Sequence, residues 1–525
     1  MTDRKLINKN NFYILVLFTI SILLNRHYAN LGILPVDSFL HFDVSFKILK
    51  GLTPYSDIWM VSGVVVNYIQ ALFFYILGIN WSSYVMHASV FNCIITLSTY
   101  FLLKDFKINT NYCFIYSIFF AILAYPSSGT PFVDHHSTFF SLLGFYSLLL
   151  AIKNDKKIFW FLIPIFFGFA FLSKQVPVSY IGLFTFLVLI YYSFTFKKIE
   201  FVKFIIFGSL TFLSFVLIFG FLAGIKLENF VQQHILYPTT IGQSRIDSLN
   251  LQFTFQKFIG HFKFIHLAIL PILIINLKKI FLNKEYFKSK NFFYFITILS
   301  FTYCLIIHQL LTKNQTYIFF VIPFLVAFSH QVLSEEKIRR KNLFFLSLII
   351  FCFFITIKYH LRFNEGRKFH DLSSVDLSKS IPAEKIDKKL SGLNWISPEY
   401  QNNVEQEINL IIDIKKYLET DKRNKMVVTH YSFLATILNE NYFTPTIGFP
   451  NDGSTYPIKK NKFAKHYKNL IINGIRKNNI EVIYIIHPIK KESIYDYIDK
   501  TCFKEEVIFD ELKSYKVLKC NDLND

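Results

Sequence analysis

Four charged side chains stand close to where apolar stretches of this sequence give way to polar ones. Asp37 follows the first apolar stretch, and Asp134 opens a later one. Lys174 closes the stretch after that, and Arg245 lies in a long polar segment. A carboxylate can take a proton from an attacking group, and a lysine can pair with a phosphate. These four side chains are therefore the first candidates for chemistry.

Each candidate also has a structural interpretation, which the sequence alone leaves open. Asp37 and Asp134 both precede helix-like stretches, where an aspartate commonly caps the first turn. Lys174 could extend its ammonium group to lipid headgroups instead of holding a substrate phosphate.

Two further patterns are weaker. His135 and His136 invite a metal site, but adjacent helical residues point about 100° apart, so we predict no metal there. Asp43 is a fallback for the base. Together with Lys47 and Lys50 it forms one charged stripe at helical spacing, which we expect to face solvent.

The composition is that of a membrane protein. Of 525 residues, 53% are hydrophobic and 63 are Phe, too apolar for one soluble domain. The net charge of +20 does not predict nucleic-acid binding, because the basic residues fall mostly in short runs between apolar stretches. Such runs are typical of a membrane-orientation signal.

The apolar stretches predict about 11 transmembrane helices, since a crossing needs about 20 apolar residues. They are 11–29, 84–103, 111–126, 136–152, 157–173, 176–196, 203–224, 263–282, 291–311, 315–333 and 342–359.

A twelfth stretch, 60–78, is ambiguous because it carries Ser62, Gly63, Asn67 and Gln70. If it does not cross, the inner loops hold about 20 Lys and Arg and the outer loops about 8, the expected positive-inside bias. We therefore predict that 60–78 is re-entrant or juxtamembrane.

This orientation predicts a transmembrane domain over 1–359, with outer loops at 31–83 and 225–262. It places a soluble α/β domain, 360–525, outside the cytoplasm. That domain alternates helix-like and β-rich runs, which are Asn403–Leu418, Lys425–Val428, Lys460–Lys477, Glu481–Ile486, Glu506–Phe509 and Tyr515–Leu518.

Cys502 and Cys520 flank the last two β-rich runs. An oxidising compartment would permit a disulfide between them, and two unpaired thiols are the alternative. The other four cysteines lie in apolar stretches, where we expect them to pack as small apolar residues.

Several of these features together resemble one known family. An acidic residue follows the first span, with Gly51 fourteen residues after Asp37, and Val133-Asp134 opens a later helix. The run 168–174, Gly-Phe-Ala-Phe-Leu-Ser-Lys, is similar to a Gly-Leu-Ala-Phe-Leu-Thr-Lys segment of the family, and 317–323 resembles its late Tyr-to-Pro stretch. The chain thus resembles the GT-C superfamily of membrane glycosyltransferases, near the protein O-mannosyltransferase and lipid A aminoarabinose transferase branch.

The sequence also departs from the family pattern. Ser38 stands where a second acid is usual, and Gln175-Val176-Pro177 replaces Gly-Pro after Lys174. The Lys-Pro-Pro element that often follows the first loop is replaced by Val61-Ser62-Gly63-Val64. These departures bear on the acceptor more than on the class of reaction.

The resemblance implies an inverting glycosyltransferase of the cytoplasmic membrane that uses a sugar linked to polyprenyl phosphate. The acceptor would be a hydroxyl group of a lipid, glycan or protein at the outer face. Asp37 would be the base, Lys174 and then Arg245 would bind the lipid phosphate, and Asp134 would orient the acceptor or hold Lys174.

No cofactor is indicated. Some members of the family use a divalent metal, but no acidic cluster in this sequence requires one. Two rival interpretations are a transporter of envelope lipid or polysaccharide and an assembly factor of the cell envelope.

Overall fold

The computed structural model describes residues 2–124, 128–197, 199–247, 253–312, 318–337, 339–450 and 452–524. The chain forms two compact units, each built from three separate stretches, and we describe each by itself. The first unit comprises Met1–Ala29, Val85–Val216 and Arg245–Phe369. The second comprises Asn30–Tyr84, Leu217–Ser244 and His370–Asp525.

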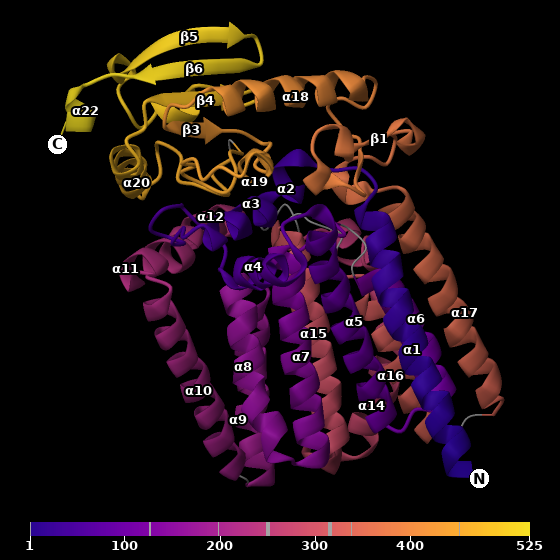
Figure 1. Ribbon diagram of the computed structural model, residues 1–525. Coiled ribbons are helices and arrows are strands. Elements are labelled where there is room, and N and C mark those ends of the chain that lie inside the picture. Colours follow the sequence, from indigo (N-terminus) through magenta and orange to yellow (C-terminus); the bar gives the residue numbers. More distant parts are fainter. Residues whose placement is uncertain are drawn as a thin grey trace. The chain divides into compact units, whose positions relative to one another are not determined.

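Long apolar helices dominate the first unit (Figure 1). Among the described residues, eight helices are long and apolar enough to cross a membrane, so the chain is an integral membrane protein. They are α1 (Thr2–Ala29), α5 (Trp81–Asp105), α7 (Val133–Asn154), α9 (Val178–Phe196), α10 (Glu200–Leu222), α14 (Lys263–Leu282), α15 (Lys290–Thr312) and α17 (Lys341–His360).

Three shorter apolar helices pack among them. These are α6 (Thr110–Ala124), α8 (Lys157–Ser173) and α16 (Val321–Glu335). Each of the eleven predicted stretches coincides with one of these helices, although parts of 111–126 and 315–333 fall outside the described residues. The number of crossings stays a prediction, because the shorter helices have only 15 to 17 residues.

The ambiguous stretch 60–78 contains α4 (Val65–Leu77), a helix of 13 residues in the second unit. At 1.5 Å per residue it is about 20 Å long, shorter than a hydrocarbon core of about 30 Å. A straight helix of this length does not cross the core by itself.

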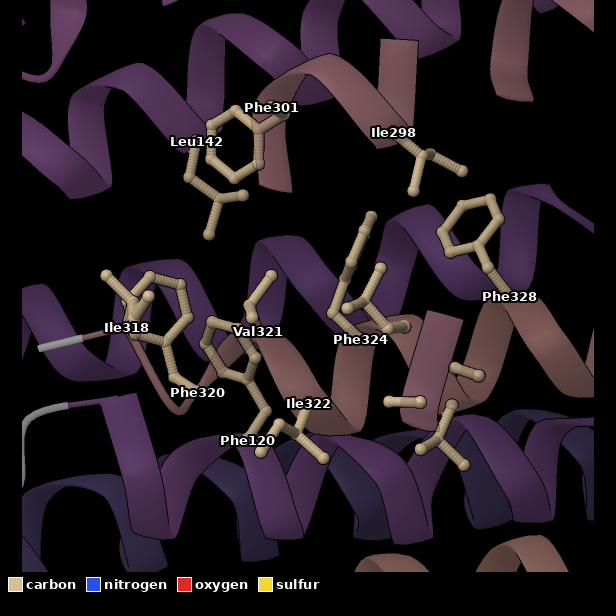
Figure 2. Close-up of a cluster of buried hydrophobic side chains, with 14 of the residues drawn as sticks. Phe120, Leu142, Ile298, Phe301, Ile318, Phe320, Val321, Ile322, Phe324 and Phe328 are labelled. Atoms are coloured by element: carbon tan, nitrogen blue, oxygen red, sulfur yellow. The ribbon is translucent and has the colours of Figure 1, made fainter. Parts of the chain in front are cut away.

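The core of the first unit is built largely from aromatic and branched aliphatic side chains. Side chains of α6, α7, α15 and α16 point toward one another in Figure 2, with Phe301 of α15 beside Leu142 of α7. The Phe301 ring also stacks on Phe145, with centroids 4.3 Å apart. This packing holds α7 and α15, which both carry site residues.

A four-stranded sheet organises the C-terminal part of the second unit, in the order β3-β4-β6-β5. β3 (Lys425–Val428) and β4 (Val482–Ile486) are parallel, whereas β6 (Leu512–Val517) is antiparallel to both β4 and β5 (Phe503–Phe509). The main helices are α18 (Val404–Thr420) and α20 (Ala464–Lys477). All four predicted β-rich runs and both predicted helices are confirmed.

The N-terminal stretch of the second unit contains α2 (Pro35–Ser38), α3 (Leu40–Leu49) and α4, and it folds together with the C-terminal residues. The prediction that the charged stripe of α3 faces solvent is wrong for two of its three residues. Asp43 is 4% exposed and Lys47 is 1% exposed, whereas Lys50 is exposed. A stripe of charges at helical spacing says nothing about a partner several hundred residues away.

The predicted outer loop 225–262 is largely helical in its described part. It contains α11 (Leu227–Phe230), the π-helix Val231–Leu236, α12 (Tyr237–Asp247) and a second π-helix, Gln256–Gly260. Gln233 accepts a hydrogen bond from the amide of Met60 and donates one to the carbonyl of Tyr55, so this segment is tied to residues 31–83, the other predicted outer loop.

A disulfide joins Cys502 to Cys520 across 18 residues of sequence, and the other four cysteines are buried thiols. The disulfide flanks the β5–β6 hairpin, as the sequence allowed. Closing a loop of this order stabilises a fold by about 3 kcal/mol.

Thiol counting tests this assignment. The protein denatured without reductant should react with four equivalents of a maleimide, and with six after reduction, because Cys502 and Cys520 are paired. The Cys502→Ser variant should show five without reductant, as Cys520 loses its partner. Intact mass spectrometry gives the count, and six reactive thiols in the unreduced wild type would contradict the disulfide.

Candidate active site

A partly buried ion pair joins two of the predicted site residues within the first unit. The Lys174 ammonium group donates to both carboxylate oxygens of Asp134, at 2.7 Å each. The side chains are 23% and 8% exposed, so solvent screens their attraction only weakly. The N-cap of α7 is Phe132, so the interpretation of Asp134 as the N-cap residue is wrong.

The pair is positioned by an antiparallel hairpin of α7 and α8, whose turn consists of Asp155 and Lys156. Asp134 is the second residue of the 22-residue α7, and Lys174 directly follows the 17-residue α8. Both residues therefore lie about 25–30 Å from the turn and opposite one another.

Small residues let these helices approach closely, as is usual between helices in membranes. A Cβ atom at Gly144 of α7 would lie 2.5 Å from the ring of Phe167 in α8. A Cβ atom at Gly208 of α10 would lie 2.2 Å from the Phe161 carbonyl oxygen. The helix α8 thus approaches a glycine on each of two neighbouring helices, with its Phe167 ring against α7 and its Phe161 carbonyl against α10.

The segment before α7 is anchored to two other parts of the first unit. Its Ser128 carbonyl accepts from the buried Arg367 guanidinium at 3.3 Å, and its Gly129 carbonyl accepts from Asn25 of α1 at 3.1 Å. Gly129 has a φ of +69°, and a Cβ atom there would lie 2.6 Å from Cα of Ala29. These contacts fix where the first turn of α7 begins.

His308 of α15 is a site residue that the sequence interpretation did not assign. Its Nε2 atom lies 3.4 Å from Oδ1 of Asp134, and its ring is buried. The available signal was a single histidine near the end of an apolar span, since ionisable groups within spans usually have a function.

Arg245, in the last turn of α12, belongs to the same unit and is close enough to His308 to act on it electrostatically. Counting Asp134, Lys174 and Arg245, the group carries one net positive charge. Such a group can bind an anion.

Of the two adjacent histidines, His136 is hydrogen-bonded to partners other than His135. His136 is hydrogen-bonded at Nδ1 to the Phe132 carbonyl (2.9 Å) and at Nε2 to Nε2 of His87 in α5 (3.0 Å). Because a carbonyl can only accept, Nδ1 of neutral His136 is the donor, and His87 donates to its Nε2. Within the described ranges, no three potential ligand side chains come together to hold a metal ion.

Asp37 belongs to the second unit, where it lies half-buried in the short helix α2. The N-cap of this helix is Leu34, whose amide donates to the Ser38 hydroxyl at 3.0 Å. The N-cap of the following helix, α3, is Phe39, so Asp37 caps neither helix and the capping interpretation is wrong.

On the adjoining helix α3, burial lowers the pKa of His41 to about 4, against the opposing effect of its 2.7 Å hydrogen bond to Asn67. His41 is thus neutral at pH 7. Tyr317, the first residue of the Tyr-to-Pro stretch, lies outside the described residues.

Comparison with known proteins gives matches only at the level of structure. No family model matches the sequence, and no curated protein matches it. The crystal structure of ArnT from Cupriavidus metallidurans in the apo state matches with a TM-score of 0.52 at 9% identity, covering 98% of each chain. ArnT from the same organism bound to undecaprenyl phosphate matches with a TM-score of 0.48 at 8% identity, covering 96% of this chain and 97% of that one.

The first of these matches shows that the chain has the fold of ArnT, a lipid A aminoarabinose transferase and GT-C glycosyltransferase, over nearly its whole length. The predicted fold class, a polytopic helical membrane protein with a C-terminal α/β region, is therefore confirmed, and the fold is ArnT-like. The roles of the individual site residues stay predictions.

The ion pair can be tested through stability. Lys174→Met leaves the Asp134 carboxylate buried without its main counter-charge and should destabilise the protein by about 3–5 kcal/mol. The double variant Asp134→Asn with Lys174→Met removes both charges and should be more stable than the single one. Thermal unfolding of the purified proteins in detergent measures the order of stability of the wild type, the single variant and the double variant.

Lys156→Met is the matched control, because Lys156 is an exposed lysine at the other end of the same hairpin. It should unfold like the wild type. A double variant less stable than Lys174→Met alone would show that the two side chains are not coupled through charge.

Proposed function

We propose that this chain transfers a sugar from a polyprenyl-phosphate donor to an acceptor hydroxyl group at the outer face of the cytoplasmic membrane. The observation that carries the proposal is its likeness to the ArnT fold over 98% of both chains. The fold alone does not establish an activity, so the proposal also depends on the chemistry of the site.

The membrane helices suit such a donor. A polyprenyl tail needs an apolar surface. The helix α10 offers one, because only 6% of its apolar 18-residue stretch is buried inside the protein. The phosphate needs a cation near the membrane boundary, and Lys174 stands at the end of α8. A lipid-linked sugar could thus keep its tail in the bilayer while its reacting carbon stands at the boundary.

In the proposed reaction, the acceptor oxygen forms a bond to the anomeric carbon of the sugar as the bond from that carbon to the phosphate oxygen breaks. The acceptor hydroxyl must lose its proton as it attacks, and Asp37 is the proposed base. Attack from the face opposite the phosphate inverts the anomeric configuration. The half-buried position of Asp37 leaves part of its side chain accessible to an acceptor.

The departing lipid phosphate gains negative charge, which the Lys174 ammonium group would stabilise, with Arg245 as a second cation. The two short contacts between Lys174 and Asp134 favour a holding role for Asp134 over direct contact with the acceptor. A preorganised cation of this kind loses little by reorganisation during the reaction. His308, whose Nε2 atom lies 3.4 Å from Oδ1 of Asp134, would restrict the carboxylate further.

Placement of the C-terminal residues 360–525 outside the cytoplasm is part of the proposal. The Cys502–Cys520 disulfide supports it, because disulfides persist in oxidising compartments and are rare in the cytosol. The distribution of Lys and Arg between the loops supports the same orientation.

Sugar release from a radiolabelled pool of polyprenyl-phosphate sugars, measured in membranes, tests the reaction. Asp37→Asn keeps the shape of the side chain but cannot act as a base, so turnover should fall by about 10²- to 10⁴-fold. Asp57→Asn, which removes a carboxylate from the same outer loop, should stay near wild type.

Equal turnover of Asp37→Asn and wild type would place the base elsewhere. A wild-type protein that is inert with every donor sugar would reject the transferase and favour a transporter or an assembly factor.

The proposed orientation has a separate test. A cysteine introduced at the exposed position Lys513 should react with a membrane-impermeant maleimide in intact cells, or in spheroplasts if an outer membrane blocks the reagent. A cysteine introduced at exposed Lys284, in a predicted inner loop, should react only after the membrane is permeabilised. The reverse labelling pattern would show that the topology is opposite to the proposed one.

A further inference from the structure

The backbone just before α2 is hydrogen-bonded to the C-terminal residues of the second unit. The amides of Gly32 and Ile33 donate to the carbonyls of Asn394 and Ile396, both at 3.0 Å, and the amide of Asn394 donates back to Asn30 at 2.8 Å. The chain just before Asp37 therefore pairs with the C-terminal domain like a short strand.

At residue 32 the chain comes so close to the C-terminal domain that only a glycine fits. Gly32 has a φ of +67°, and a Cβ atom there would lie 2.3 Å from the Leu372 side chain. A larger residue would push the segment away from the C-terminal domain.

A second anchor lies two residues after Asp37. The ring of Phe39 is fully buried, 4.5 Å from Phe433 and stacked at 6.0 Å on Trp395, measured between ring centroids. Gly448 adds a close approach, since a Cβ atom there would lie 3.3 Å from Leu40. Asp37 thus stands between two fixed points of the same domain.

The third anchor is a buried ion pair on α3. Lys47 contacts Asp43 at 2.9 Å, donates to the Thr444 hydroxyl at 2.9 Å, and lies 4.9 Å from the centre of the Tyr442 ring. Burying two charges is costly, so a pair of this kind favours a single arrangement in which all its partners are in place. Lys50, one turn further on, is exposed and serves as an internal contrast.

We infer that the C-terminal domain is the positioning element of the Asp37 segment, and that Lys47 is one of its positioning residues. The inference rests on the proposed function for its catalytic consequence, although the anchoring can be measured without any activity. Lys47 acts through α3 on the placement of Asp37 and takes no part in the bonds that form or break. The domain would therefore control the rate of transfer whatever acceptor the enzyme uses.

Kinetics test the catalytic consequence. Lys47→Met should lower kcat about tenfold or more with little change in the KM for the donor, because small displacements of a reacting group are costly in rate. Lys50→Met should match the wild type. In an Asp37→Asn background, adding Lys47→Met should cause no further loss. An equal fractional loss in both backgrounds would show that Lys47 does not work through Asp37, and would overturn the inference.

A labelling experiment tests the anchoring by itself. A cysteine replacing Asp37 should react with a soluble maleimide several-fold faster when Lys47→Met is added, and at an unchanged rate with Lys50→Met. The native cysteines do not compete, because four are buried and two are paired. If the wild-type enzyme is inert, the proposed function is rejected, and the labelling experiment still tests the anchoring by itself. An unchanged labelling rate would overturn it.

Lys47→Met strands a buried carboxylate and could fail to fold. The double variant Asp43→Asn with Lys47→Met leaves no unpaired charge, and Thr444→Val removes one hydrogen bond only. Both should speed the labelling of the introduced cysteine, Thr444→Val by the smaller factor. Labelling at the unaltered rate in both variants would contradict the inference.

Discussion

A carboxylate is tolerated at the buried end of an apolar helix only when a cation lies against it, and Lys174 is that cation for Asp134. The requirement reaches well beyond the two side chains. It demands that Asp134 and Lys174 lie at the same end of the hairpin, which a two-residue turn between helices of 22 and 17 residues achieves. It also demands a fixed start for α7, which the hydrogen bonds of Asn25 and Arg367 supply. The glycine contacts of this hairpin let its helices approach closely.

Local apolar pattern was sufficient to predict most elements of the fold. The predicted spans became helices because about 20 apolar residues in a row have few other stable arrangements in a bilayer. The strands β3 and β4 were found from short runs of β-branched residues, and the disulfide from two cysteines flanking a hairpin. Each of these signals lies within about 20 residues of sequence.

Local pattern does not predict contacts between residues that are far apart in the sequence. The stripe of Asp43, Lys47 and Lys50 looks like a solvated helix face. No residue near it in the sequence indicates that Lys47 donates a hydrogen bond to Thr444. His308 was visible as a histidine in a span, but its proximity to Asp134 depends on how α15 packs against α7. The Asp134–Lys174 contact lies between these cases. Holding Lys174 is one of the two roles that the family resemblance implies for Asp134, and the structure shows the contact.

The second unit is assembled from stretches that the ribosome makes at very different times. The backbone partners of Gly32 and Ile33 are Asn394 and Ile396, which follow them by more than 350 residues. At about 5–20 residues per second, the segment around Asp37 waits roughly 20 to 70 s for the residues that cover it. Throughout that interval the ring of Phe39 and the buried charges of α3 have no protein cover from the C-terminal domain. The second unit is therefore complete only after the last part of the protein has been made, and its early segment stays without its own domain until then.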